Sequence, residues 1–392
     1  MIKRTIQPVL EGLLKQYPVV TVTGPRQAGK TTLCRAVLPH LPYVNLERPD
    51  IRERVLDDPL GFLRRYPDGV VIDEVQRAPE LLSYVQVQVD EKRRPGQFVL
   101  TGSQNLNLSQ GISQSLAGRT ALLRLLPLSI EEALQAREPL SVDEMIFRGF
   151  YPRLYEQDLE PTRTLGDYFE TYVERDVRQL SELRDLATFQ RFVRLVAGRI
   201  GQLVNFSKLG GDAGVSHSTA SEWLSLLEAS YVIFRLPPFF ANISKRLVKS
   251  PKIYFVDVGL AAYLLGIENR DQLFSHPLRG ELFENLIVTE ALKLRTHSGK
   301  RGDNLFFYRD AGGLEADLIY SLADRLIAVE AKSGATVQRG FFKALNKLDD
   351  ILGERVLARV LVHDGDETYE HARATVTRPA DFADVLRRLA KS

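Results

Sequence analysis

The sequence contains very little cysteine, because Cys34 is the only one among 392 residues. A single thiol cannot form an internal disulfide, and it cannot supply a cysteine-rich zinc cluster. Both are therefore excluded as sources of stability. A chain without disulfides is typical of a reducing compartment, and we expect a cytoplasmic protein.

Long apolar runs and a strong excess of one charge are also missing. No stretch approaches the roughly 20 apolar residues that a membrane helix needs, and the first residues are too polar for a signal core, so we expect no membrane segment. The 52 basic residues nearly balance the 50 acidic ones, which gives a net charge of +2. Any surface that binds nucleic acid must therefore be local.

The composition is that of a folded protein with more than one domain. Hydrophobic residues make up 44% of the chain and charged residues 26%, the usual balance for a protein with apolar cores. The length exceeds the roughly 250 to 300 residues at which single cores stop growing. We expect several domains and find no internal repeat in the sequence.

A glycine-rich motif lies near the N-terminus, between a β-branched run at 19–23 and a helical segment at 31–38. It matches G-x-x-x-x-G-K-[ST], and a strand before it and a helix after it form the setting in which backbone amides and a helix N-terminus surround phosphate oxygens. We expect ATP to bind here, at Gly24, Pro25, Arg26, Gln27, Ala28, Gly29, Lys30, Thr31 and Thr32.

Individual roles follow from the chemistry of nucleotide hydrolysis. Lys30 should reach the β- and γ-phosphates, and Thr31 should place its hydroxyl on Mg²⁺. Asp73 follows the buried strand Val70-Val71-Ile72 and is expected to hold Mg²⁺ through water. The next residue, Glu74, should orient the attacking water. This pair of acids indicates hydrolysis in addition to binding.

Two further elements complete the expected nucleotide site. Ser103, Gln104 and Asn105 follow the next strand, where one of them is expected to sense the γ-phosphate or the water. The charge of the transition state usually also needs an arginine, from the same chain or a neighbouring subunit. Arg119 and Arg175 are the candidates. The sequence leaves open that each is a structural ion-pair residue.

The first domain is expected to be α/β with a parallel sheet and to cover residues 1–150. Its strands alternate with segments long enough for helices, which is the pattern of a parallel sheet covered on both faces. A helix that begins after Ser129, as an N-cap, follows the last strand. The strands are expected at 19–23, 43–46, 69–74, 97–102 and 120–125.

The next two segments are expected to form a helical lid, at 151–196, and a winged helix-turn-helix, at 197–265. In the second, helices at 206–209 and 217–228 flank a turn through Gly210–Gly214. The wing strands are expected at 231–236 and 252–256, and Lys245, Arg246 and Lys249 lie between them. The second helix lacks arginine and lysine on its polar face, so phosphate contacts by the wing are favoured over base reading. Packing or oligomer contacts are the alternative.

Residues 266–392 are expected to form a second α/β domain, and three of them carry its chemistry. Asp317 lies on one predicted strand, and Glu330 and Lys332 lie two apart on the next, so that both point to one face. This spacing follows the pattern of the PD-(D/E)xK nucleases. Asp317 and Glu330 would bind a divalent metal, Mg²⁺ or Mn²⁺, while Lys332 would activate water. Glu284 is the expected accessory acid.

Two alternatives stay open for this domain. An acid and a lysine two apart are common on solvated sheet faces, where the pair contributes little. A nuclease-like fold can also keep these residues and serve only to bind DNA.

The chain resembles a known group in several segments: Thr23–Leu33, Val71–Gln76, Leu100–Ser103, Leu116–Arg119 and Leu126–Ser129. They look like those of bacterial and archaeal AAA+-type ATPases whose C-terminal domain is nuclease-like. The resemblance covers nearly the whole chain. It implies an α/β P-loop ATPase core with a helical lid, a winged helix-turn-helix, and a C-terminal domain like that of restriction endonucleases.

These features together favour a Mg²⁺-ATP-hydrolysing protein that binds and processes duplex or branched DNA, as in recombination or repair, and that forms a homo-oligomer. Nuclease activity is left open. The alternative is an ATP-controlled switch that binds a protein partner and whose nuclease-like domain is catalytically silent.

Overall fold

The computed structural model describes residues 1–92, 94–103, 115–173, 185–240, 250–310 and 312–391. The chain divides into two compact units. The first contains Met1–Leu128, Ala229–Tyr231 and Thr296–Lys300, and the second contains Ser129–Glu228, Val232–Arg295 and Arg301–Ser392. The N-terminal stretch of the first unit thus ends at Leu128, and the two helices that follow lie in the second unit. The expected domain boundary near residue 150 stays a prediction.

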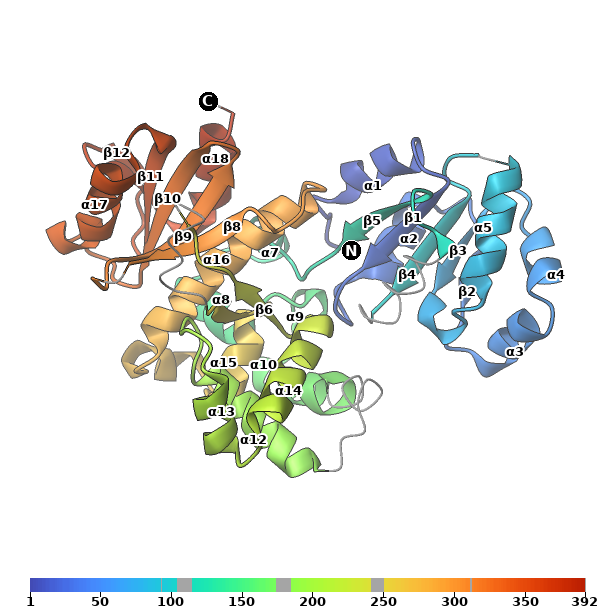
Figure 1. The fold of residues 1–392 in the computed structure, drawn as a ribbon, viewed down its shortest axis with the longest axis horizontal. Coiled ribbons are helices and arrows are strands. Elements are labelled where there is room, and N and C mark those ends of the chain that lie inside the picture. The colour runs from blue at the N-terminus through green and yellow to red at the C-terminus, as the bar shows by residue number, and fades with distance from the viewer. Residues whose placement is uncertain (93, 104–114, 174–184, 241–249, 311, 392) are drawn as a thin grey trace. The chain divides into compact units, whose positions relative to one another are not determined.

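A five-stranded parallel sheet forms the centre of the first unit, and every strand expected from the sequence is present (Figure 1). The strand order across the sheet is β2-β3-β4-β1-β5. The strands are β1 (Val19–Thr23), β2 (Tyr43–Asn45), β3 (Val70–Asp73), β4 (Phe98–Gly102) and β5 (Thr120–Arg124).

Helices cover both faces of this sheet, which explains why its strands are almost continuously apolar. Alternate residues face opposite sides: Val70 and Ile72 pack in one apolar core and Val71 in the other. The helices on the first side are α3 (Pro49–Asp57), α4 (Pro59–Arg64) and α5 (Leu81–Lys92), and those on the second are α1 (Gln7–Leu14) and α2 (Lys30–Val37). Cys34 of α2 is fully buried in the second core. A short 3₁₀ turn, η1 (Val75–Arg77), follows β3.

The second unit begins with helices. Ser129 caps the first of them as predicted, in a capping box in which its side chain accepts from the Glu132 amide and the Glu132 side chain accepts from the Ser129 amide. Within the described residues, segment 151–196 contains helices and no strand. The elements up to residue 197 are α7 (Ile130–Ala136), α8 (Val142–Arg148), α9 (Pro152–Glu156), α10 (Pro161–Tyr168), the π-helical η2 (Phe169–Val173) and α12 (Leu186–Ala197).

Two helices and a hairpin follow, in the expected order. They are α13 (Phe206–Ala213), α14 (His217–Ala229) and the antiparallel strands β6 (Ile233–Leu236) and β7 (Lys252–Phe255). The expected turn through Gly210–Gly214 is wrong in extent, because α13 continues to Ala213 and only Gly214 adopts the left-handed conformation that ends a helix. Lys245, Arg246 and Lys249 lie outside the described residues.

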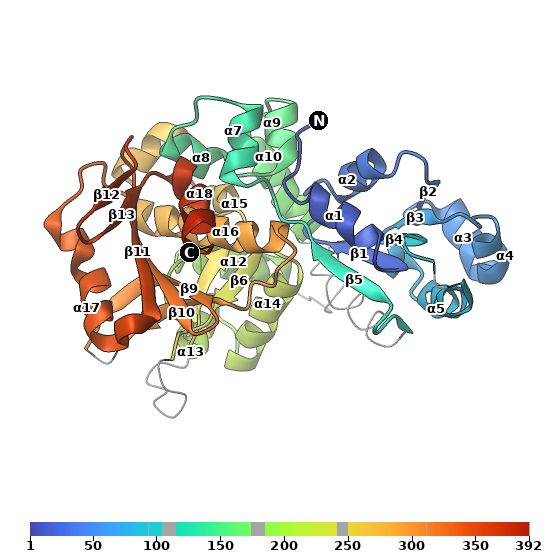
Figure 2. The ribbon, with the colours of Figure 1, turned by 90° about the horizontal axis from the view of Figure 1, so that it is seen from above.

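The second unit also contains a six-stranded mixed sheet in the order β12-β13-β11-β10-β9-β8. Figure 2 shows β9 to β13, and Figure 1 shows β8. Apolar runs at 304–308, 314–320, 326–331 and 356–362 predict four of these strands. No sequence pattern predicts β12, β13 or the last helix, α18. The strands are β8 (Leu305–Arg309), β9 (Glu315–Leu322), β10 (Arg325–Lys332), β11 (Val356–His363), β12 (Tyr369–His371) and β13 (Ala374–Thr377). The helical elements are α15 (Val258–Leu264), η3 (Arg270–Ser275), α16 (Arg279–His297), η4 (Arg339–Phe342), α17 (Lys343–Leu352), η5 (Gly353–Arg355) and α18 (Pro379–Leu389).

Buried polar contacts join residues 129–150, which were expected to belong to the first domain, to the later parts of the second unit. The Glu290 carboxylate of α16 accepts from the Ile130 amide at 3.0 Å, and the Asp257 carboxylate accepts from the Phe150 amide at 2.7 Å. The Lys293 ammonium lies 4.0 Å from the centroid of the Phe150 ring. These elements therefore share one interior. No helix in the described ranges is both long and apolar enough to cross a membrane.

Two glycines provide a test of this packing. A Cβ atom on Gly259 would lie 2.5 Å from the Gly149 amide nitrogen, whereas one on Gly211 would meet no atom within 4 Å. We expect Gly259→Ala to lower the free energy of unfolding by about 2 to 4 kcal/mol, since the clash is with backbone. The matched Gly211→Ala change should raise it by about 0.5 to 1 kcal/mol, because alanine favours helix. Urea unfolding followed by the fluorescence of Trp223, the single tryptophan, measures both.

Candidate functional site

The glycine-rich loop leaves the carboxyl end of β1 and enters α2 at Lys30. Gly24 has φ of 144° and a Cβ there would lie 1.9 Å from the Leu125 carbonyl oxygen, so only glycine fits. Lys30 is 6% exposed, and its ammonium donates to the carbonyl oxygens of Gly24 at 2.9 Å and Pro25 at 2.8 Å. The loop thus holds its lysine inside the curve of its own backbone.

The Asp73 carboxylate accepts hydrogen bonds from three side chains of this site. It is 4% exposed, at the carboxyl end of β3. Its Oδ2 atom accepts from the Thr31 hydroxyl at 3.0 Å and from the Tyr43 hydroxyl at 2.5 Å, and its Oδ1 atom accepts from the Thr101 hydroxyl. The two residues expected to hold Mg²⁺, Thr31 and Asp73, are therefore in direct contact. Hard oxygen ligands of this kind fit Mg²⁺.

Glu74 follows at the same sheet edge with an unusual backbone. Its φ of 58° is rare for a residue other than glycine, and such conformations concentrate at functional sites. The carboxylate accepts from the Gln76 amide and from the Ser103 hydroxyl, the latter at 3.3 Å. The structure thus brings Ser103 to Glu74, whereas Gln104 and Asn105 lie outside the described residues.

The two arginine candidates do not join this group. Arg119 lies immediately before β5, at the amino edge of the sheet, and forms a two-bond ion pair with Asp90 at 2.6 and 2.8 Å. This contact raises the pKa of Arg119 and matches the structural alternative. Arg175 lies outside the described residues. Arg124 does reach the carboxyl edge, beside Thr23 in register, and its guanidinium lies 5.5 Å from the centroid of the Tyr231 ring.

The remaining loop residues play different parts. Arg26 lies 3.9 Å from Glu47, Ala28 is buried, and Thr32 is exposed. Sequence reasoning missed Arg4, which is 6% exposed and donates to the Ala28 carbonyl oxygen at 2.7 Å and thereby supports the loop from beneath. It also missed Tyr43. No motif marks either residue, because each reaches the loop only through the fold.

Burial makes the one cysteine unreactive. Cys34 lies under the loop, and burial together with the nearby Asp73 carboxylate raises the pKa of its thiol to about 12. The thiolate is the reactive form of cysteine. At neutral pH the group is therefore a small apolar side chain, and thiol chemistry has no part in this site.

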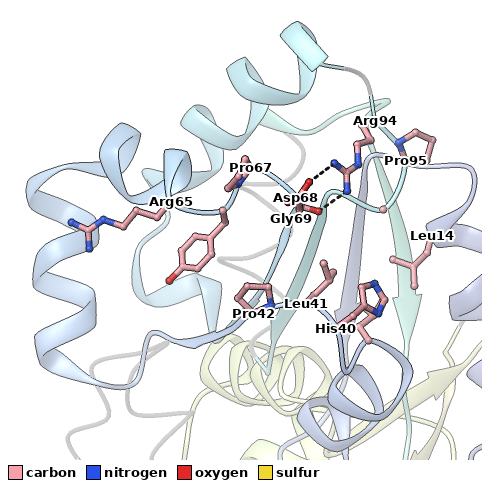
Figure 3. Close-up of a pocket in the computed structure, with 13 residues that line it drawn as sticks. Leu14, His40, Leu41, Pro42, Arg65, Pro67, Asp68, Gly69, Arg94 and Pro95 are labelled. Atoms are coloured by element: carbon pink, nitrogen blue, oxygen red, sulfur yellow. Dashed lines mark hydrogen bonds and ion pairs between the residues drawn. The ribbon is translucent and has the colours of Figure 1, made fainter.

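A separate concavity of about 540 Å³ lies at the opposite, amino edge of the sheet (Figure 3). Pro42 and Gly69 line it just before β2 and β3, and Arg94 is paired with Asp68 across it at 3.1 Å. Phosphate-binding loops in parallel sheets lie at the carboxyl edge. This concavity is therefore distinct from the expected nucleotide site.

The C-terminal acids meet on neighbouring strands β9 and β10. The Lys332 ammonium lies 2.6 Å from Glu330 Oε1 and 3.8 Å from Asp317 Oδ2, and Asp317 Oδ2 accepts from the Ala331 amide at 2.8 Å. Both carboxylates are more than nine-tenths buried. The predicted constellation is therefore one cluster, and Glu330 borders a cavity of about 590 Å³ beside α17.

Charge repulsion and burial strain this cluster. Burial, the Asp317 charge and Glu284 raise the pKa of Glu330 to about 8, although Lys332 opposes the shift. The Glu330 Oε2 atom is buried and makes no hydrogen bond among the described residues. An unsatisfied carboxylate oxygen next to a second acid is an arrangement that a divalent cation would relieve.

Glu284 lies beside this cluster but is already engaged. Its Oε1 atom accepts from the Lys252 ammonium at 2.8 Å and from the Tyr254 hydroxyl at 2.5 Å. Within the described parts of the chain, no three acidic, histidine or cysteine side chains are grouped as a metal site. Two carboxylates completed by water suffice for Mg²⁺, so Asp317 and Glu330 fit a divalent cation.

Comparisons with known protein families separate the chain into three parts. Residues 16–134 match the family described as AAA domain. Residues 140–271 match Domain of unknown function (DUF8612), and residues 279–380 match Domain of unknown function (DUF4143). The first unit is therefore an AAA-type P-loop ATPase domain.

Relatives cover almost the whole chain. The chain is 32% identical over 378 residues to the uncharacterized protein Rv2008c of Mycobacterium tuberculosis, which covers 95% of this chain and 82% of that protein. This chain therefore belongs to the same protein family as Rv2008c. An uncharacterized protein of Haemophilus influenzae is 26% identical over 252 residues, which is 59% of this chain and 58% of that protein.

Among solved structures, the Walker-type ATPase PABY2304 of Pyrococcus abyssi has a TM-score of 0.44 at 15% identity, over 66% of this chain and 94% of that one.

The buried acids predict an unusual pH dependence for the metal-free protein. Burial raises the pKa of Glu290 and Glu284 to about 7, and that of Glu330 to about 8. A carboxyl whose pKa is raised by folding stabilises the fold below its unfolded pKa, near 4.5, and this stability is lost as pH rises through the folded value. We expect the free energy of unfolding to fall by about 3 kcal/mol or more between pH 5 and 8.

Urea titrations read by Trp223 fluorescence in the presence of a chelator test this expectation. Glu330→Gln should lower the slope of the curve from pH 5 to 8 and leave it nearly flat between pH 7 and 8, where Glu330 is the main group still titrating. The exposed-turn change Asp324→Asn should leave the curve unaltered. Constant stability from pH 5 to 8 would contradict the assignment.

Proposed function

We propose that this protein hydrolyses ATP with Mg²⁺ to process duplex or branched DNA, and that its C-terminal acids bind a divalent cation for phosphodiester cleavage. The observation that carries the first part is the direct contact between Thr31 and Asp73 beside the buried ammonium of Lys30. This arrangement supports the binding of Mg²⁺ and phosphate oxygens at these groups.

Each residue of the nucleotide site has a defined task in this proposal. Lys30 would exchange its loop carbonyl partners for phosphate oxygens, and Thr31 and Asp73 would hold Mg²⁺, which balances the phosphate charge when bound. Glu74 would accept a hydrogen bond from the attacking water. Ser103 and Gln76 now occupy that carboxylate and would fix its direction. The arginine for the transition state is assigned to Arg124 in place of Arg119.

The C-terminal cluster suits attack of water on a phosphodiester. Asp317 and Glu330 would hold the cation, which supplies Lewis-acid polarisation of the phosphate. The Lys332 ammonium, next to both acids, would orient the water and offset charge on the phosphate oxygens. Water would add to phosphorus and give up one proton to bulk solvent while the bond to the leaving oxygen breaks, and the leaving oxygen would take a proton from solvent.

Tyr231 gives a physical route from nucleotide to the rest of the protein. It lies two residues after the end of α14, has φ of 58°, and is 5% exposed. Its hydroxyl donates to the Thr23 hydroxyl at 3.1 Å, and Thr23 is the residue before the phosphate loop. A movement of the phosphate loop would therefore shift Tyr231 and the segment that joins α14 to β6.

A second candidate is supported by the surface of α14. His217, Ser218, Glu222 and Ser225 are exposed, whereas Ala220, Trp223, Leu224 and Leu227 are buried. The exposed side offers no arginine or lysine to DNA bases. An ATP-controlled switch that binds a protein partner through this side, with a silent C-terminal site, is the alternative function.

A panel of linear, forked and four-way DNA, assayed for binding, ATPase stimulation and cleavage with Mg²⁺ or Mn²⁺, tests the proposal. We expect Glu74→Gln to keep ATP binding and lose hydrolysis by about 100-fold or more, with Glu80→Gln as the surface control. Asp317→Asn and Lys332→Ala should each lower cleavage by at least about 100-fold and leave ATPase activity intact. A wild-type protein that neither binds nor responds to any DNA refutes the proposal and favours the switch.

A second prediction concerns coupling. Tyr231→Phe removes one hydroxyl that touches the phosphate-loop strand and leaves the ring in place. ATP affinity should change less than threefold, while stimulation of ATPase activity by DNA should fall by about half or more, because this contact is worth roughly 1 kcal/mol. Tyr17→Phe, at an exposed position, is the matched control. Full stimulation in Tyr231→Phe would remove this residue from the route.

A further inference from the structure

The C-terminal acids are accompanied by two lysines that differ in origin and environment. Lys332 was expected, lies on β10, and is 35% exposed in its side chain. Lys252 lies on β7, outside the expected nuclease-like domain, and its side chain is 2% exposed. A buried lysine is rare unless its charge is paired. The partners of Lys252 therefore explain why it is there.

Lys252 is held against two acids of the C-terminal unit. Its ammonium lies 2.8 Å from Glu284 Oε1 and also contacts Glu315. Tyr254, two residues further on the same strand face, donates to the same Glu284 oxygen at 2.5 Å. Burial lowers the pKa of Lys252, but Glu284, Asp317 and Glu315 more than offset this effect, and its pKa is raised. The side chain is therefore a permanent cation.

The strand that carries Lys252 is fixed on both sides. The Asn285 side chain of α16 accepts from the Phe255 amide at 2.7 Å and donates to the Phe255 carbonyl oxygen at 3.0 Å. On the same edge of β7, the Ile253 carbonyl oxygen accepts from the Gly201 amide at 2.8 Å, and the opposite edge pairs with β6. The position of the ammonium is thus set by backbone contacts, and it does not depend on a flexible surface side chain.

The charged groups around Asp317 and Glu330 indicate the role of the Lys252 ammonium. Four carboxylates and three cationic side chains meet here: Glu284, Glu315, Asp317 and Glu330 with Lys252, Arg309 and Lys332. Glu284 and Glu315 are paired with Lys252, and Arg309 lies 3.2 Å from Glu315. Asp317 and Glu330 are paired with Lys332, whose side chain is 35% exposed and not buried like that of Lys252. Among the four acids in the described residues, Glu330 is the one with a buried oxygen that makes no hydrogen bond.

We infer that Lys252 replaces a second divalent ion, so that the C-terminal site binds one divalent cation, on Asp317 and Glu330, and not two. This inference rests on the proposed metal binding and specifies its stoichiometry. It also makes Lys252 a positioning residue of the site: it holds Glu284 away from the metal, and the hairpin β6–β7 supplies a charge that residues 266–392 lack.

Titration of the full chain with Mn²⁺ alone, without nucleotide, tests the inference. Free Mn²⁺ measured by electron paramagnetic resonance gives the number of ions bound per chain. Ions that disappear in Asp317→Asn belong to the C-terminal site. We expect one such ion in the wild type and two in Lys252→Met, which removes the charge but keeps the length. Lys252→Arg, which keeps the charge, and the exposed control Lys208→Met should each bind one.

Variants of Glu284 give a second test. They are needed because Lys252→Met leaves a buried acid unpaired, so the folding of the Lys252→Met protein must be checked by Trp223 fluorescence. Glu284→Gln keeps the lysine and should still bind one ion, with affinity lowered by less than about tenfold, since Glu284 is not a ligand. The double change Lys252→Met with Glu284→Gln should return the count from two to one.

Distinct results overturn the inference and the proposed function. Two Asp317-dependent ions in the wild type, or loss of Mn²⁺ binding in Glu284→Gln, overturn the inference. An absence of any Asp317-dependent ion overturns both it and the proposed metal site. One ion in the wild type with no cleavage of any DNA supports the stoichiometry and refutes only the nuclease activity.

Discussion

The burial of one carboxylate, that of Asp73, organises the nucleotide site. A buried charge is costly unless it is fully hydrogen-bonded, and three hydroxyls, from Thr31, Tyr43 and Thr101, meet this one. These donors come from α2, β2 and β4, so the contact that satisfies the charge also fixes the helix and the flanking strands around β3. In the proposed function, Thr31 and Asp73 would therefore be held in place before Mg²⁺ binds.

The C-terminal cluster differs from the Asp73 site in how its charges are compensated. In this cluster the acids outnumber the neutral hydrogen-bond donors, and carboxylates of like charge lie close together on adjacent strands. Lysines compensate, one from within the domain and one from the hairpin before it. Removing one partner of a buried ion pair leaves an uncompensated charge, which is strongly destabilising. The hairpin and the C-terminal sheet are thereby bound into one interior, in agreement with their place in one compact unit.

Structural features that depend on a few consecutive residues were predictable from the sequence. The loop Gly24–Thr31, the acids after β3, and the serine cap before α7 each depend on a few neighbouring side chains. The spacing of Glu330 and Lys332 likewise predicted their shared face, because side chains alternate along a strand. The two extra strands β12 and β13 escaped prediction, since they are short and carry polar side chains such as Glu370 and His371.

Contacts between residues far apart in the sequence could not be predicted from the sequence, for a physical reason. The meeting of Lys252 with Glu284 joins positions 32 apart, and it depends on how β7 lies against α16, which no local pattern encodes. Arg119 has the residue type of a catalytic arginine, but β5 places it at the amino edge, where it pairs with Asp90. The sequence states which groups exist, and the register of strands and helices decides which of them meet.

The burial of Cys34 has a practical consequence. Its thiol is fully enclosed and holds its proton well above neutral pH, so alkylating dyes and spin labels have no native target on the folded chain. Cysteines introduced at exposed positions of either unit would therefore carry a label alone, without removal of the natural residue. Distances between two such labels would report how the units move when nucleotide binds.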